Sequence, residues 1–175
     1  MDFKRSLTKI VTIFNNEQID YMLVGGFAMS FYNRFRFTAD IDCVIQIHPH
    51  HVDQIIKYFP DWESFTPAFK ENVAKGLLFN LTDFETGVKY DFMPYQDSDY
   101  SWTAFERRRK VDFYDTDCFI ASPEDLVISK LKWYNISKSA KQLEDIKFLL
   151  KETDLDMQYL IGWSNRLTLL RHGLF

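Results

Sequence analysis

The sequence predicts an α+β fold that ends in a helical extension, and three observations favour this class. Up to about residue 120, short apolar runs typical of strands alternate with segments whose apolar side chains recur at helical spacing. Beyond that point only helical patterns follow. The 175 residues fit one domain, or one domain with a small appendage. We therefore predict a core over residues 1–120 and a helical C-terminal extension, residues 121–175, that packs on it.

The first part of the chain predicts two helices and two strands. Residues 3–15 place their apolar side chains at helical spacing and predict an amphipathic helix. The apolar run at 22–24 predicts a short buried strand, and residues 27–32, after a glycine pair, predict a helix. Residues 38–44 predict a second strand, because polar and apolar side chains alternate along it.

The middle of the chain predicts a β-hairpin between helices. Its elements are, in order, a helix at 50–59, a turn-rich segment at 60–75, antiparallel arms at 76–81 and 88–93, a helix at 99–110 and a short strand at 118–120. The four basic residues Arg107–Lys110 indicate either a solvated helix end or a contact to nucleic acid. For His48, His50 and His51 we expect a solvated turn, because their spacing does not suit a zinc site.

A start signal for a helix opens the extension. Ser122 can cap the helix, Pro123 suits its first position, and acids follow in its first turn. Two more helices follow, the first with its apolar side at 143–150 and the second over about 155–164. The following aromatic side chains are expected in the core or between the two parts rather than against a base: Trp102, Trp133, Tyr134 and Trp163.

Composition and charge narrow the class of protein. The net charge of −4 and the pI near 5.6 argue against broad non-specific binding of nucleic acid, although they are compatible with a local basic groove. Cys43 and Cys118 lie far apart and match no metal spacing, so we expect buried free thiols and a cytoplasmic location. No apolar run approaches the roughly 18 residues of a membrane-spanning helix, so we expect no membrane partner.

Three aspartates carry the predicted chemistry. Asp40 and Asp42 occupy alternate positions of one strand, so they share a face with Cα atoms roughly 6–7 Å apart. Carboxylates at that distance can share one divalent ion or hold two ions about 3.5–4 Å apart. Asp91 lies between Tyr90 and Phe92, where a carboxylate without a partner is costly to bury. A metal would supply that partner. The alternative interpretation is that Asp40 and Asp42 are two acids on a solvated edge strand.

The glycine pair Gly25-Gly26 lies between the first strand and the following helix. A strand, a glycine turn and a helix start suit a phosphate group, because free backbone N–H groups and the helix dipole both favour an anion there. The sequence therefore predicts a phosphate-binding turn close to the acidic strand.

These residues together resemble a known superfamily. Gly25-Gly26, the Asp40-x-Asp42 pair and a lone Asp91 on a later strand look like the nucleotidyltransferase superfamily that includes DNA polymerase β. The run at 122–131 and the acids before Ile146 are similar to AbiEii-type nucleotidyltransferase toxins and their uncharacterised bacterial relatives. The resemblance covers roughly residues 20–150, and it implies the nucleotidyltransferase fold, a mixed sheet flanked by helices.

The resemblance also implies a metal-dependent reaction. Asp40, Asp42 and Asp91 would hold two Mg²⁺ ions, or Mn²⁺ in their place, against the triphosphate of an NTP, with Asp91 helping to deprotonate the acceptor. A nucleoside monophosphate would pass to an unknown acceptor, which is a tRNA, a protein or a small molecule. In the toxin-like case an antitoxin would be the partner.

Five further positions are predicted to belong to the site. Gly25 and Gly26 would let the backbone approach the phosphates, and Lys130 would contact a phosphate or the acceptor. Asp145 would orient Lys130; the alternative for both is a solvated helix face. Arg36 would reach a phosphate or form a surface ion pair. Because Gly26 stands where the superfamily usually has serine, the alternative function is a catalytically attenuated module that binds a nucleotide or a protein.

Overall fold

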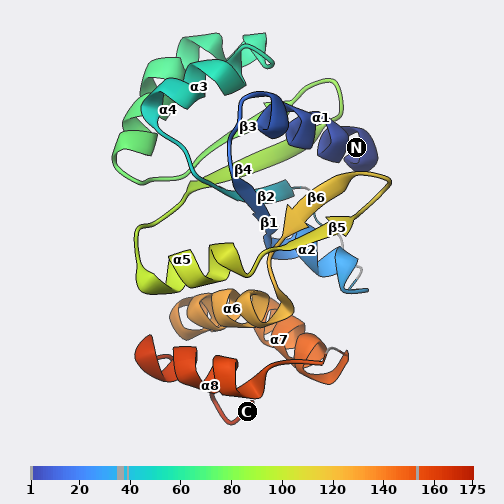
Figure 1. Cartoon of the computed structure of the whole chain (residues 1–175), viewed down its shortest axis with the longest axis vertical. Helices are drawn as coiled ribbons and strands as arrows, with labels where there is room; N and C mark the ends of the chain where they lie inside the picture. Colours follow the sequence, from blue (N-terminus) through green and yellow to red (C-terminus); the bar gives the residue numbers. More distant parts are fainter. Residues whose placement is uncertain (1, 35–37, 39, 153) are drawn as a thin grey trace.

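The computed structural model describes residues 2–34, 38, 40–152 and 154–175. These residues form a six-stranded mixed sheet in the order β3-β4-β2-β1-β6-β5 (Figure 1). The strands are β1 (Tyr21–Val24), β2 (Asp40–Ile45), β3 (Phe79–Asp83), β4 (Val88–Pro94), β5 (Arg109–Asp112) and β6 (Asp117–Ile120). The helices are α1 (Phe3–Asn16), α2 (Gly25–Phe31), α3 (Pro49–Ile56), α4 (Thr66–Ala74), α5 (Asp99–Glu106), α6 (Pro123–Ser137), α7 (Ala140–Glu152) and α8 (Met157–Arg166), with a 3₁₀ turn η1 (Pro60–Phe65).

Two apolar clusters, one on each face of the sheet, make up the core. The first joins α1, α3 and α4 to side chains such as Ile41 and Cys43. The second contains side chains of the helices α5, α6, α7 and α8, which pack against Met22 of β1 and against α2. Figure 1 shows α6, α7 and α8 gathered at one end of the molecule, away from α1, α3 and α4. Both faces of the central strands are therefore covered by helices.

The alternation along β2 decides which residues enter which face. Ile41, Cys43 and Ile45 are buried in the first cluster, whereas Asp40, Asp42 and Val44 point to the other face and stay partly exposed. The predicted strand with polar and apolar sides is therefore confirmed. Cys43 and Cys118 are buried free thiols, also as predicted.

The predicted helix at 99–110 was wrong in its extent. It ends at Glu106, and Arg109 and Lys110 instead begin β5, where they pair with Ile120 and Phe119 of β6. The turn-rich segment at 60–75, to which the sequence analysis assigned no element, contains η1 and α4. At residues 109–110 the pairing with β6 overrides the local helical pattern. No feature within residues 99–110 could reveal that pairing, because the partner strand lies outside the segment.

The extension begins where the sequence placed its start. The hydroxyl of Ser122 accepts a hydrogen bond from the backbone N–H of Asp125 at 3.1 Å and donates one to its carboxylate at 2.6 Å, which caps α6. The division into a core of residues 1–120 and an extension stays a prediction, because side chains of α6 share one apolar cluster with Met22 and Ala28. No described helix is long and apolar enough to cross a membrane.

Candidate active site

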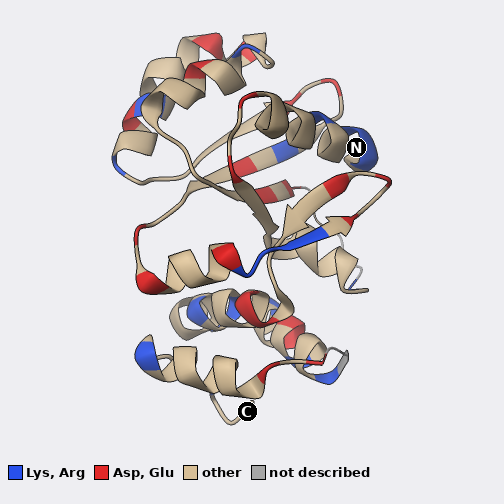
Figure 2. Ribbon diagram, in the orientation of Figure 1, with Lys and Arg blue, Asp and Glu red and all other residues tan. Residues whose placement is uncertain are grey.

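The three predicted aspartates lie together on the face of the sheet that is turned toward α6. β2 and β4 are parallel neighbours, and their register places Asp42 directly opposite Asp91. Asp40, two residues earlier on the same face, lies opposite Lys89. Neighbouring strands are about 4.8 Å apart, so residues far apart in sequence become adjacent side chains. Figure 2 shows these acidic positions on β2 and β4 at the centre of the sheet.

The glycine pair lies against the same carboxylates. β1 is antiparallel to β2 and pairs Val24 with Asp42, and the chain then turns directly into α2 at Gly25. Gly25 has a φ of +65°, and a Cβ built on it would lie 2.0 Å from Oδ2 of Asp42. The backbone N–H of Gly26 points at the same oxygen, 3.4 Å away. Only glycine allows the chain to turn this tightly beside the carboxylate.

Lys89 is a member of the site that the sequence analysis missed. Its ammonium donates to Oδ2 of Asp91 at 2.9 Å and lies 3.5 Å from Oδ1 of Asp40. The hydrogen bond to Asp91 raises the pKa of Lys89 most strongly, and the charges of Asp91 and Asp40 add to the effect. Its position two residues before Asp91 was the available signal, because alternation places both on one face.

The carboxylates of the site repel one another. Burial raises the pKa of Asp42 above its ordinary value, and the neighbouring charges of Asp91 and Asp40 raise it further. The Gly26 N–H and Lys89 act in the opposite direction. Oδ1 of Asp91 is buried and has no hydrogen-bond partner among the described residues.

The donor set fits a divalent cation, although the aspartates do not yet form a closed metal site. Within the described ranges, no three His, Cys, Asp or Glu side chains are gathered closely enough to hold a metal ion as they stand. The ammonium of Lys89 lies between two of the carboxylates instead. Hard carboxylate oxygens, mutual repulsion and a buried acceptor without a donor are the features that a hard cation such as Mg²⁺ would satisfy.

A cleft of about 300 Å³ opens over the aspartates, between the sheet and the extension. Its sheet side is lined by the glycine pair, Thr38 and the three aspartates, and its other side by α6 and α7. The residues that line it from α6 and α7 are Leu126, Ser129, Lys130, Trp133, Lys141 and Gln142. Trp133 is 59% exposed at this rim and Trp102 is 61% exposed elsewhere, so the expectation of core or interdomain positions was wrong for both.

Lys130 and Asp145 form a buried ion pair at the edge of the cleft. Their charged groups lie 2.7 Å apart, with 5% and 1% of the side chains exposed. The alternative of a solvated helix face is therefore wrong for both residues. Arg34, to which the sequence analysis gave no role, approaches the other oxygen of Asp145 at 3.5 Å. Asp145 thus joins a lysine of α6 to the segment that follows α2.

The predicted histidine cluster lies outside this site. Arg36 falls outside the residues that the structure describes. The histidines begin α3, where the backbone N–H of His48 donates to Nδ1 of His51 at 2.9 Å, and no described zinc ligands join them.

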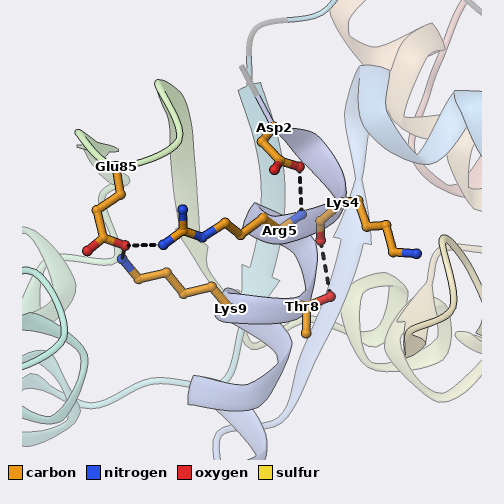
Figure 3. A pocket seen from close by; sticks show the side chains of 6 residues that line it. All are labelled: Asp2, Lys4, Arg5, Thr8, Lys9 and Glu85. Carbon is orange, nitrogen blue, oxygen red and sulfur yellow. Dashed lines mark hydrogen bonds and ion pairs between the residues drawn. The ribbon is translucent and has the colours of Figure 1, made fainter.

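A pocket of about 540 Å³ on the outer side of α1 contains none of the predicted site residues (Figure 3). In Figure 3 the side chains of Arg5 and Lys9 both reach Glu85, with ion-pair distances of 3.2 and 3.6 Å. Lys4 pairs with Asp115. The three cations that line this pocket are therefore already paired with carboxylates.

A family model described as "Nucleotidyltransferase of unknown function (DUF6036)" matches residues 3–162. The chain belongs to this family. The match includes every predicted site residue and confirms the resemblance to nucleotidyltransferases, but it does not support a specific relation to AbiEii-type toxins. A comparison with curated proteins found no match.

Several solved structures share the fold of this chain. An antigenic nucleotidyltransferase-like protein from Paracoccidioides brasiliensis is 18% identical, with a TM-score of 0.56 over 94% of this chain and 86% of that one. The lincosamide antibiotic adenylyltransferase LnuA with lincomycin bound is 16% identical, with a TM-score of 0.50 over 85% and 97%. ANT(2'')-Ia in complex with adenylyl-2''-tobramycin is 12% identical, with a TM-score of 0.57 over 94% and 96%. The predicted nucleotidyltransferase fold is confirmed.

Gly25→Ala is expected to destabilise the protein by about 1–3 kcal/mol, because alanine disfavours a positive φ and its Cβ would collide with Asp42. Urea unfolding measures the loss. Gly162→Ala is the matched control: a Cβ there meets nothing within 4 Å, and alanine in helix α8 should stabilise by about 0.5–1 kcal/mol. Equal stability of Gly25→Ala and the unmodified protein would contradict the account of this turn.

Proposed function

We propose that this protein transfers a nucleoside monophosphate from an NTP to an acceptor and releases pyrophosphate. The pairing of Asp42 with Asp91 across β2 and β4, beside the turn at Gly25, carries the proposal. A structural domain has little reason to gather carboxylates that repel one another at a cleft, whereas a cation-binding site requires it. Membership in a nucleotidyltransferase family points in the same direction.

Asp40, Asp42 and Asp91 would hold the divalent metal, two Mg²⁺ ions in the preferred case and Mn²⁺ as a substitute. A metal bound there would neutralise charge on the phosphates and lower the pKa of the acceptor hydroxyl. The donor chemistry supports this assignment, since Oδ1 of Asp91 is buried without a hydrogen-bond donor among the residues that the structure describes. Lys89 would have to leave the carboxylates as the cation enters, because its ammonium contacts two of them.

The protein's own groups supply binding and proton transfer. The absence of side chains at Gly25 and Gly26 would let the phosphates lie against the backbone, while Lys130 and Lys141 face them from the extension. The acceptor oxygen forms a bond to the α-phosphorus, and the bond from that phosphorus to the bridging oxygen of the pyrophosphate breaks. Asp91 takes the proton of the acceptor hydroxyl. Most of the rate enhancement would come from positioning and charge stabilisation.

The proposal is tested by label transfer. The purified protein is incubated with Mg²⁺, each of the four NTPs labelled at the α-phosphorus, and a cell extract, which is then separated into RNA, protein and small-molecule fractions. We expect label in one fraction with release of an equal amount of pyrophosphate, loss of both in EDTA, and recovery with Mn²⁺. No label and no pyrophosphate with any NTP would overturn the proposal.

The fractions also distinguish the acceptor classes. Label on tRNA or on a protein would favour a toxin-like enzyme, for which an antitoxin partner is then expected. Label on a small molecule would favour an enzyme of the kind represented by LnuA and ANT(2'')-Ia, whose structures contain lincomycin and an adenylylated tobramycin. The buried free thiols support a cytoplasmic setting for any of these reactions.

Gly26 favours one second candidate, a catalytically attenuated module that binds a nucleotide. A serine hydroxyl at this position would offer the phosphates a hydrogen bond that glycine cannot. This candidate predicts that NTP and Mg²⁺ raise the thermal stability of the protein while no label is transferred, since a ligand bound only by the folded state must stabilise it.

A further inference from the structure

A second cavity, of about 380 Å³, adjoins the cleft over the aspartates. Five side chains line both the cleft and this second cavity and so separate the two: Val24, Met93, Leu126, Ser129 and Trp133. The second cavity lies two residues farther along β2 and β4, on the same face of the sheet. There Val44 follows Asp42 on β2, Met93 follows Asp91 on β4, and the register pairs the two. The lining therefore changes from carboxylates to apolar side chains within one strand pair.

Helices α5 and α6 close the far side of this apolar cavity. Tyr100 and Ala104 line it from α5, and both are more than nine-tenths buried. Together with Met22 and Pro94 they form a largely apolar wall, while Gln96, Ser101 and Ser129 add polar groups to other parts of the lining. Such a lining suits a flat or ring-shaped apolar body.

One cation, Lys132, and one carboxylate, Asp125, line this cavity. The ammonium of Lys132 lies 4.0 Å from the centre of the Tyr100 ring, and among the described residues it forms no ion pair. Burial lowers the pKa of Lys132, and the charge of Asp125 opposes this shift only in part. Asp125 itself is occupied, since its two oxygens accept hydrogen bonds from Tyr159 at 2.7 Å and from Ser122 at 2.6 Å. A half-buried ammonium in apolar surroundings is complementary to an anionic ligand group.

The place of the cavity relative to the aspartates indicates which substrate enters it. In an α-phosphoryl transfer the attacking oxygen and the leaving pyrophosphate lie on opposite sides of the phosphorus. Asp40 lies at one end of the carboxylate row and Gly25 lies against Asp42, whereas the apolar cavity lies on the far side of the Asp42–Asp91 pair, where Val44 pairs with Met93. Phosphates bound at the glycine turn would therefore leave the apolar cavity to the acceptor.

Resting on the proposed function, we propose that this cavity binds the acceptor, and that the acceptor is a small molecule with an apolar, ring-sized body and an acidic group. The acidic group pairs with Lys132, the ring packs between Met93 and Tyr100, and a hydroxyl reaches Asp91 past Trp133.

Two fluorescent probes of the same shape test the cavity without any transfer reaction. Anilinonaphthalene sulfonate carries an anion, and phenylnaphthylamine is its neutral counterpart. We expect the sulfonate to bind at one site at least about tenfold more tightly than the amine, and Lys132→Met to abolish that preference. Lys110→Met, an exposed lysine of β5, is the control and should change nothing.

Filling the cavity is the second arm. Ala104→Phe and, nearer the rim, Ser101→Phe should each weaken the sulfonate at least about tenfold while Mg²⁺-ATP binding is retained. Circular dichroism identifies a variant that fails to fold. In that case the sulfonate affinity of the other variant tests the proposal. Binding that is weak or indifferent to charge overturns the proposal. The proposal is also overturned if Mg²⁺-ATP displaces the probe and the cavity-filling variants lose ATP binding. The cavity would then hold the base of the nucleotide instead of an acceptor.

The outcomes separate this inference from the proposed function. Asp42→Asn should bind the sulfonate normally, because Asp42 does not line the apolar cavity. In the extract assay we expect the label in an acidic, small-molecule fraction, and Ala104→Phe should lower it at least about tenfold. Label confined to RNA or protein would overturn the inference alone. Absence of label from every fraction, with the probe bound as expected, would count against the proposed function instead.

Discussion

Asp42→Asn is expected to lower nucleotide transfer by about 1,000-fold or more, the size typical of removing a charged group from a reaction centre. Asp42 lies at the middle of the site, opposite Asp91 and against the turn at Gly25, so its loss removes both a metal ligand and the charge that the site is built to hold. Asparagine keeps the shape and the contact from Gly26. The measurement is release of pyrophosphate at saturating Mg²⁺ and NTP.

The same substitution should stabilise the metal-free protein, which separates a lost function from a lost fold. The folded state raises the pKa of Asp42, chiefly through burial and then through Asp91. Asp42 therefore favours folding only while it is protonated, below the pKa of the unfolded chain, and this contribution is lost as pH rises through the folded pKa. The stability gain of Asp42→Asn over the unmodified protein should grow from acidic to neutral pH in urea unfolding.

Mg²⁺ provides the matching control for Asp42. It should raise the unfolding temperature of the unmodified protein and have much less effect on Asp42→Asn, since a ligand stabilises only the state that binds it. Asp61→Asn, at an exposed position of η1, should leave transfer, stability and the Mg²⁺ effect unchanged. Full transfer activity in Asp42→Asn would refute the assignment of the aspartates.

Asp145→Ala is expected to cost about 3–5 kcal/mol of folding free energy, the largest stability effect that we predict. The substitution removes a carboxylate that lies 2.7 Å from the ammonium of Lys130 in a nearly solvent-free position. Lys130 cannot regain water without moving its helix, because its side chain is only 5% exposed. Urea unfolding at neutral pH measures the difference.

Glu144→Ala is the matched control for Asp145. The two acids are adjacent in sequence and both pair with Arg34, but Glu144 is 67% exposed, so its removal should cost about 0–1 kcal/mol. The double substitution Lys130→Met with Asp145→Leu should recover much of the stability, because apolar pairs often replace a buried ion pair without loss. If Lys130 contacts a phosphate, this double variant should fold and still bind NTP poorly. A small cost for Asp145→Ala would contradict the view that the pair holds α6 to α7.

Local patterns were sufficient for most elements of the fold. The amphipathic α1, the alternation of β2, the arms of the β3–β4 hairpin and the cap at Ser122 depend on neighbours a few residues away, so each could be predicted from its own segment. The end of α5 could not. Arg109 and Lys110 form a strand because β6 lies beside them, and that pairing is decided elsewhere in the chain.

The sequence by itself indicated the three aspartates and the glycine pair, and it determined that Asp40 and Asp42 share a face, because alternation is a property of any strand. Only the tertiary structure decided that Asp91 meets Asp42, that Lys89 lies between the acids, and that Lys130 and Asp145 pair out of contact with water. The register between two strands depends on how whole sheets and helices pack, and burial depends on which element covers a residue. Neither is encoded within a segment short enough to be read alone.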